Sequence, residues 1–130
     1  MKHVEVVCAI IKKDDKYFCC QRGPGRALAY KWEFPGGKIE FNETKEEALV
    51  REIKEELYSD IKVIRFIGIS NHDYVELEKP FSITMYAYLC ELVSGDLELT
   101  EHVDSKWVTF EEMKCMDFAA ADIPLIKKII

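Results

Sequence analysis

Three glutamates near the middle of the chain have a spacing that would gather their carboxylates. Glu52, Glu55 and Glu56 stand at positions i, i+3 and i+4, so a helix would present them on one face. Converging carboxylates repel one another, and a divalent cation relieves that repulsion because hard cations such as Mg²⁺ or Mn²⁺ prefer oxygen ligands. The spacing therefore predicts a metal site built on a helix.

The surrounding sequence predicts the helix that must carry these glutamates. Thr44 and Glu47 have the spacing of a capping box, in which each side chain accepts a hydrogen bond from the other residue's backbone N–H. On a helical wheel, an arc of roughly 100° is apolar. It contains Leu49, Val50, Ile53 and Leu57. We expect this arc to pack against the protein and the neighbouring acidic arc to bind metal.

The rest of the chain predicts a mixed sheet with short packing helices. Strand patterns and turn signals alternate over residues 4–11, 17–21, 32–34, 61–70, 72–77, 81–92 and 107–108. A second capping box at Thr109 and Glu112 predicts a short helix. Asp122, with Pro124 in the first turn, predicts a C-terminal helix that runs to residue 130. Since no repeat or linker interrupts the pattern, we expect one α+β domain over residues 1–130.

Composition limits the classes of protein that this chain fits. The 130 residues are 48% hydrophobic and 32% charged, which is typical of a globular protein. No apolar run approaches the roughly 20 residues that span a bilayer, so no membrane partner is expected. The net charge of −6 disfavours a nucleic-acid polymer but not a small anion held through a metal. Five cysteines without a C-x-x-C pair, and no signal-peptide pattern, favour free thiols in the cytoplasm.

The spacing around the three glutamates matches a known motif. The run is Gly37, five residues, Glu43, seven residues, Arg51-Glu52-Ile53, one residue, and Glu55-Glu56. It resembles the Nudix box of the Nudix hydrolases, and the preceding run Trp32-Glu33-Phe34-Pro35-Gly36-Gly37-Lys38 is similar to the MutT-like branch. Six specified residues would coincide with a chance on the order of 10⁻⁷. The alternative, a solvated acidic helix face, explains neither the glycine pair nor the Arg-Glu pair.

The resemblance implies a fold, a cofactor and a set of catalytic residues. The implied fold is an α/β/α sandwich with a central mixed sheet, one catalytic helix and a C-terminal helix. The implied cofactor is Mg²⁺ or Mn²⁺, held by the Gly37 carbonyl, Glu52, Glu55 and Glu56. Arg51 would orient a neighbouring carboxylate, with Glu43 as the candidate.

Catalysis would also use Glu101, which lies six residues before Trp107. A glutamate stands at a comparable distance before a tryptophan in MutT-like enzymes. The choice of general base stays open between Glu52 and Glu101.

Four further residues are candidates for substrate binding. By resemblance, Arg22 and Lys38 would contact phosphates, although each could be an ordinary surface cation. Phe34 or Trp32 could form a wall for a base, although an aromatic residue in a short strand is more often part of the core. Asp122 lies in an Ala-Asp-Ile-Pro stretch similar to that of relatives described as CTP pyrophosphohydrolases. It could accept a hydrogen bond from a cytosine amine, act as a helix N-cap, or do both.

One position departs from the family pattern. The family has glycine two residues after the last glutamate of the box, where this chain has Tyr58. A left-handed conformation at the helix end would cost tyrosine about 1 kcal/mol relative to glycine. Either the helix ends differently or the protein tolerates this strain.

Together these features predict a metal-dependent hydrolase of nucleotides, acting in sanitation of the nucleotide pool. The expected reaction converts a nucleoside or deoxynucleoside triphosphate, CTP-like or oxidised, to the monophosphate and pyrophosphate. The alternatives are hydrolysis of ADP-ribose or dinucleoside polyphosphates, and a sensing module that binds a nucleotide without cleaving it. The protein would act as a monomer or homodimer.

Overall fold

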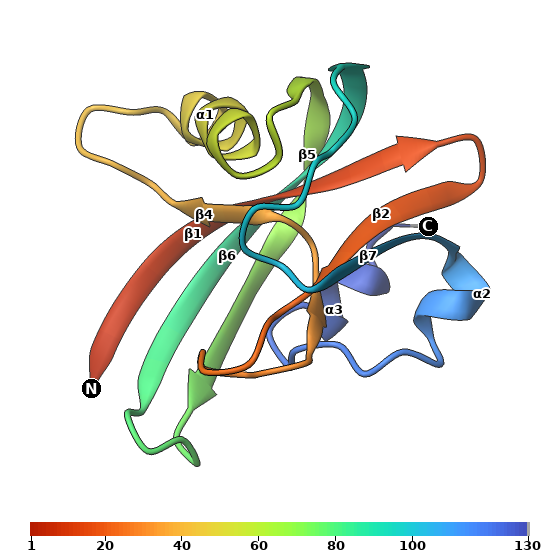
Figure 1. Ribbon diagram of the computed structural model, residues 1–130. Coiled ribbons are helices and arrows are strands. Elements are labelled where there is room, and N and C mark those ends of the chain that lie inside the picture. Colours follow the sequence, from red (N-terminus) through yellow and green to blue (C-terminus); the bar gives the residue numbers. More distant parts are fainter. Residues whose placement is uncertain (130) are drawn as a thin grey trace.

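A mixed β-sheet covered on both faces forms the centre of the computed structural model, which describes residues 1–129 (Figure 1). In these residues the strands are β1 (Lys2–Lys13), β2 (Lys16–Gln21), β3 (Trp32–Glu33), β4 (Gly36–Lys38), β5 (Asp60–Tyr74), β6 (Phe81–Ser94) and β7 (Asp104–Thr109). The helices are α1 (Lys45–Leu57), α2 (Phe110–Met113) and α3 (Ile123–Ile126). α1 packs on one face and the two short helices on the other, which confirms the predicted α+β sandwich.

Strand β1 organises the sheet because it changes partners along one edge. On one side it pairs in parallel with β6 from Lys2 to Ile11. On the other side it pairs with β4 at Val6–Cys8 and with β2 only at Lys12 and Lys13. Strands β2 and β7 therefore diverge from β1 and β6, as Figure 1 shows, and the two parts of the sheet open away from each other.

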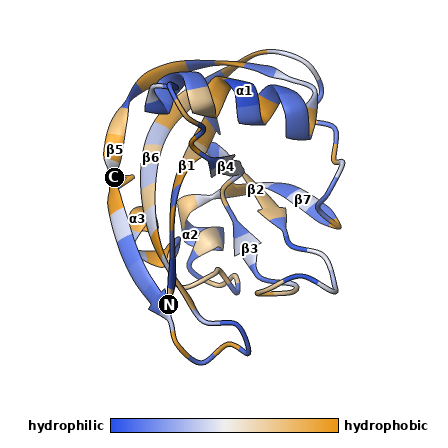
Figure 2. Ribbon diagram, turned by 90° about the vertical axis from the view of Figure 1, so that its left-hand side faces the viewer, coloured by the Kyte–Doolittle hydropathy of each residue, from blue (hydrophilic) through white to orange (hydrophobic). Residues whose placement is uncertain are grey.

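Side chains of β1 alternate between two hydrophobic clusters, as a strand buried on both faces requires. Val7, Ala9 and Ile11 belong to the cluster under α1, whereas Cys8 and Ile10 belong to the cluster under the C-terminal segment. Figure 2 shows α1 with both hydrophobic and hydrophilic stretches lying over the sheet. The helix is thus amphipathic, as its sequence predicts.

Helix α1 begins as predicted but buries a different arc. The capping box at Thr44 and Glu47 is present, with both reciprocal hydrogen bonds formed. Val50, expected in the packed arc, is 37% exposed, while Ala48 is fully buried. The buried face is therefore rotated toward the acidic side, where Glu52 and Glu56 are half-buried rather than solvated.

Three other predicted elements differ from the structure. The strands expected at 61–70 and 72–77 are one strand, β5, because Asn71 and His72 continue the pairing with β6. Residues 36–38 lie beyond the strand predicted at 32–34, yet they form β4, since glycine can lie flat against β1. Helix α3 ends at Ile126, and the predicted end at residue 130 lies outside the described residues.

Two predictions from composition can also be compared with the structure. All five cysteines are free, and four of them are buried. No helix in residues 1–129 combines the length and the apolar character needed to cross a membrane.

Tyr58 accepts the strained conformation that the family pattern assigns to glycine. The residue after Leu57 has φ 49° and ψ 40°, and its N–H donates to the carbonyl of Lys54 to close the helix. Its side chain is 64% exposed, so little packing offsets the strain. The helix thus ends at the family position, with a residue that disfavours that backbone.

Replacing Tyr58 with glycine should stabilise the protein. We expect Tyr58→Gly to raise the free energy of unfolding by about 0.5–1 kcal/mol, because relief of left-handed strain exceeds the extra chain entropy of glycine. Urea unfolding measures the change. Asn42→Gly, at φ 64° on an exposed turn, is the matched control and should gain less, because asparagine tolerates this conformation. A less stable Tyr58→Gly variant would contradict the prediction.

Candidate active site

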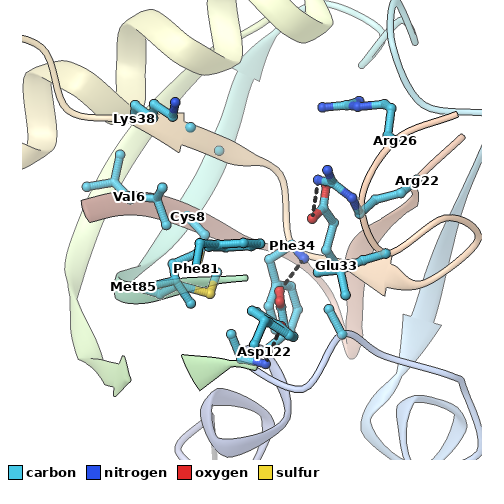
Figure 3. Close-up of a pocket in the computed structure, with 18 of the residues that line it drawn as sticks. Val6, Cys8, Arg22, Arg26, Glu33, Phe34, Lys38, Phe81, Met85 and Asp122 are labelled. Atoms are coloured by element: carbon cyan, nitrogen blue, oxygen red, sulfur yellow. Dashed lines mark hydrogen bonds and ion pairs between the residues drawn. The ribbon is translucent and has the colours of Figure 1, made fainter. Parts of the chain in front are cut away.

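A cavity of about 290 Å³ opens where the two parts of the sheet separate (Figure 3). Its apolar wall comes from β1, β6 and the residue after β3, and includes Val6, Cys8, Phe34, Phe81 and Met85. Its polar lining comes from several segments and includes Arg22, Arg26, Glu33, Lys38, Glu56 and Asp122. An apolar slot with a few converging polar groups is the usual form of a small-molecule site.

The glycine pair of β4 lets the acidic face of α1 approach the sheet. A Cβ atom on Gly37 would collide with the carboxylate of Glu52, and one on Gly36 would collide with the backbone of Val7. Position 36 therefore requires glycine, whereas a side chain at position 37 would force the Glu52 carboxylate to move. The Glu52 side chain is only 16% exposed as a result, and it lies directly beside β4.

Arg51 holds several of the nearby carboxylates. Its guanidinium donates twice to Glu43, at 2.6 Å from Nε and 2.9 Å from Nη2, which is the pair that the sequence suggested. Nη1 donates to Glu52 at 2.9 Å and to Glu55 at 3.2 Å. Nη2 also donates to the carbonyl of Lys38 at 3.1 Å, so Arg51 ties α1 to β4 as well. These hydrogen bonds lower the pKa of Glu43.

One carboxylate oxygen of Glu56, Oε2, is buried without a hydrogen-bond partner in the described residues. Burial raises the pKa of Glu56 to about 8, and the nearby carboxylates of Glu52, Glu101 and Glu33 add to the shift. Burial also raises the pKa of Glu52, although Arg51 opposes that effect. An unpartnered carboxylate oxygen among other carboxylates attracts a cation strongly.

Glu55 and Glu101 lie at the outer edge of this cluster. The Glu55 side chain is 62% exposed and faces Arg51. Glu101 is 53% exposed in the loop before β7, where it faces Arg26 at 3.8 Å. With these orientations, no three His, Cys, Asp or Glu side chains in residues 1–129 stand ready to enclose a metal ion.

The four predicted substrate residues all line the same cavity. Phe34 is 2% exposed and packs against Phe118, with ring centroids 5.5 Å apart. Arg22 is held in place by Glu33 and by the carbonyl of Ala27. Lys38 lies at the end of β4, above the apolar wall in Figure 3.

Asp122 does not cap α3, contrary to one interpretation of the sequence. No side-chain capping bond forms; instead Oδ2 accepts a hydrogen bond from the backbone N–H of Phe34 at 2.9 Å. Figure 3 shows this bond reaching across the floor of the cavity. Burial, reinforced by the charge of Glu33, raises the pKa of Asp122 well above its usual range. Asp122 therefore ties the C-terminal segment to the cavity wall and favours its protonated form there.

Sequence reasoning missed Arg26 and Glu33, which line the cavity, and His102, which bonds to Glu33. Glu33 follows Trp32 on β3 and accepts hydrogen bonds from Arg22 and from His102, the latter at 2.9 Å. The imidazole of His102 is 3% exposed, and its sequence position shows no ligand spacing. Its adjacency to Glu101 is the one signal in the sequence that could have drawn attention to it.

Comparison with known proteins agrees with this arrangement. The family model described as the NUDIX domain matches residues 1–129. The chain belongs to the Nudix family. It is 35% identical to the CTP pyrophosphohydrolase of Escherichia coli K12, with 98% of this chain and 91% of that protein covered. It is 31% identical to the 8-oxo-dGTP diphosphatase of the same organism, with 99% and 98% covered.

The fold agrees with that of solved relatives. A crystal structure of a MutT Nudix hydrolase from Burkholderia pseudomallei superposes with a TM-score of 0.82 at 21% identity, and both chains are covered completely. The protein is thus a Nudix hydrolase of the MutT-like branch, as the central run and the Trp-Glu-Phe-Pro run indicated.

Nudix hydrolases typically depend on a divalent metal, and the residues here fit one. The possible donors are all oxygen atoms: the unpartnered Oε2 of Glu56, the carboxylate of half-buried Glu52 and the carbonyl of Gly37. Glu55 would join this set by leaving Arg51, which keeps its stronger bonds to Glu43. The fit rests on the chemistry of these donors.

The stability of this Nudix hydrolase without metal should fall as the pH rises. Folded Glu56 holds its proton up to a pKa of about 8, against an ordinary value of 4.5, so the folded state binds more protons between these values. Glu56→Gln should weaken this dependence and gain on the order of 1–2 kcal/mol at about pH 9, after allowance for partial exposure.

Urea unfolding in a chelator at about pH 5 and about pH 9 measures this effect. The exposed Glu55→Gln is the matched control on the same helix and should keep the wild-type pH dependence. Identical pH profiles for wild type and Glu56→Gln would contradict the assignment of the shift to Glu56.

Proposed function

We propose that this Nudix hydrolase converts a nucleoside or deoxynucleoside triphosphate to the monophosphate and pyrophosphate, with Mg²⁺ or Mn²⁺ as cofactor. A cytidine or oxidised nucleotide is the proposed substrate. One observation carries the proposal: Glu56 and Gly37 line the same cavity as Asp122 and Phe34. A single nucleotide could therefore place its base against Phe34 while its phosphates reach the acids of α1. The names of the two relatives reported above also favour a triphosphate.

The groups in the cavity and on the neighbouring face of α1 have distinct proposed roles. Glu52, Glu55, Glu56 and the Gly37 carbonyl would hold the metal, which when bound offsets phosphate charge and acidifies a water. Arg51 orients Glu52 through its bond at 2.9 Å. Either Glu52 or Glu101 would take the proton of the attacking water. Arg22 and Lys38 would contact the phosphates as cationic donors.

Asp122 is the proposed contact for the base. One of its oxygens is occupied by the N–H of Phe34, and the residue lines the cavity. In its protonated form a carboxyl group both donates and accepts a hydrogen bond, whereas its ionised form only accepts. It could therefore accept a hydrogen bond from the amine of a pyrimidine and donate one to its ring nitrogen.

Pyrophosphate release with Mg²⁺, measured over a panel of normal and oxidised nucleoside triphosphates, ADP-ribose and dinucleoside polyphosphates, tests the activity. We expect turnover of a triphosphate, and a loss of about 10²-fold or more in kcat for Glu55→Gln and Glu56→Gln, because each removes a charged metal ligand.

The matched control is Glu111→Gln, which changes an exposed carboxylate of α2 that pairs with Lys114, and it should keep full activity. Far-ultraviolet circular dichroism should show all variants folded, because the apolar side of α1 is unchanged. Tight nucleotide binding by wild type without turnover of any panel member would refute the enzymatic proposal in favour of a sensing module.

The role of Asp122 predicts a change of base preference. Asp122→Asn should alter the ratio of kcat/KM values for CTP and dGTP by about tenfold, because a fixed amide replaces a group that can exchange its proton. Asp117→Asn is the control on the same segment, exposed and paired with Lys31. An unchanged profile in Asp122→Asn would restrict Asp122 to holding Phe34.

A further inference from the structure

The buried imidazole of His102 has no place in the reaction described so far. It lies in the loop between β6 and β7, directly after the candidate catalytic residue Glu101. A histidine whose side chain is only 3% exposed needs polar partners. Nε2 has one, the Oε2 atom of Glu33 at 2.9 Å, whereas Nδ1 has none within residues 1–129. The side chain therefore depends on the bond to Glu33.

Glu33 connects that imidazole to the substrate side of the cavity. The same carboxylate accepts from Nη1 of Arg22 at 3.2 and 3.3 Å, and its side chain is only 19% exposed. Arg22 in turn donates from Nε to the carbonyl of Ala27, which fixes the loop after β2. Glu33 and Arg22 are shown bonded beside the cavity in Figure 3. One carboxylate thus joins two loops through charge-assisted bonds.

The loop that carries His102 also carries Glu101. This loop packs closely against the start of the Arg22 loop: a Cβ atom on Gly23 would lie 3.1 Å from the side chain of Val103. The N–H of Val103 donates to the carbonyl of Gln21 at 3.1 Å. Glu101 is close enough to Glu56 to raise its pKa. Whatever sets the position of this loop therefore sets the distance between Glu101 and the acids of α1.

We propose that His102 is a positioning residue, which acts through Glu33 to fix Glu101 and Arg22 relative to each other. The proposal rests on the proposed triphosphate hydrolysis, since it concerns the alignment of phosphates between these two residues. The bond from His102 to Glu33 joins the loop that carries Glu101 to the carboxylate that holds Arg22. Losing it would leave Glu101 and Arg22 present but misaligned with each other.

Two substitutions at His102 separate alignment from packing. His102→Leu fills a similar volume without a donor, and His102→Gln keeps an N–H at similar reach. We expect His102→Leu to lower kcat for CTP about tenfold to a hundredfold, because small misplacements of reacting groups are costly. His102→Gln should stay within about threefold of wild type. The affinity for CMP, measured by calorimetry, should change by less than about threefold in both, because the cavity wall and the Arg22–Glu33 pair remain.

A double-variant cycle tests the path through Glu33. If His102 acts through that carboxylate, Glu33→Leu, which removes the acceptor, combined with His102→Leu should lose no more kcat than Glu33→Leu alone. His3→Leu, an exposed histidine at the start of β1, is the matched control and should have wild-type kcat. Thermal unfolding of every variant shows whether a loss of kcat follows a loss of folded protein.

The outcomes distinguish this inference from the proposed function. An active wild type with unchanged kcat in His102→Leu would overturn the positioning role alone. The same holds if His102→Gln is as impaired as His102→Leu, or if the two single losses multiply in the double variant. A wild type that releases no pyrophosphate from any triphosphate would overturn the proposed function and the positioning role together.

Discussion

The close approach of α1 to β4 is the constraint on which the rest of this structure depends. Gly36 and Gly37 have no side chains, so the helix can bring Glu52 against the strand, and Arg51 then bridges the helix to the Lys38 carbonyl. Removing a carboxylate from water is unfavourable unless an opposite charge or hydrogen bonds compensate for the lost hydration. Arg51 compensates for Glu43 and Glu52, and leaves Glu56 uncompensated. The packing of one helix thereby leaves a buried carboxylate at a place where a cation would be stabilised.

The sheet places these acidic groups beside the cavity. Strand β1 pairs with β4 at Val6–Cys8 and with β2 only at Lys12 and Lys13, so the two parts of the sheet diverge. Val6 and Cys8 line the cavity, and the C-terminal segment closes its far side. That segment is fastened by Asp122 to the backbone of Phe34 and by the N–H of Ala121 to the hydroxyl of Tyr74. The base end of the cavity thus depends on contacts between residues 88 and 47 positions apart as well as on local packing.

Local sequence predicted the elements whose causes are local. Thr44 and Glu47 start α1 because both capping bonds lie within three residues, and the Arg51–Glu43 pair follows from one loop and one helix turn. Contacts between segments far apart in the chain could not be predicted from the sequence. The bond of Asp122 to Phe34 replaced a plausible N-cap, and the partnership of His102 with Glu33 spans 69 residues. No periodicity in a single sequence encodes such pairings, because they arise only when the sheet brings its loops together.

The unpartnered carboxyl of Glu56 has a consequence for how the enzyme would exchange ions with its surroundings. With a pKa of about 8, this group carries a proton in neutral solution. A divalent ion that uses its oxygens must displace that proton, so metal loading and proton release become one event. The apparent affinity for metal would then weaken by roughly tenfold for each unit of acidification below that pKa.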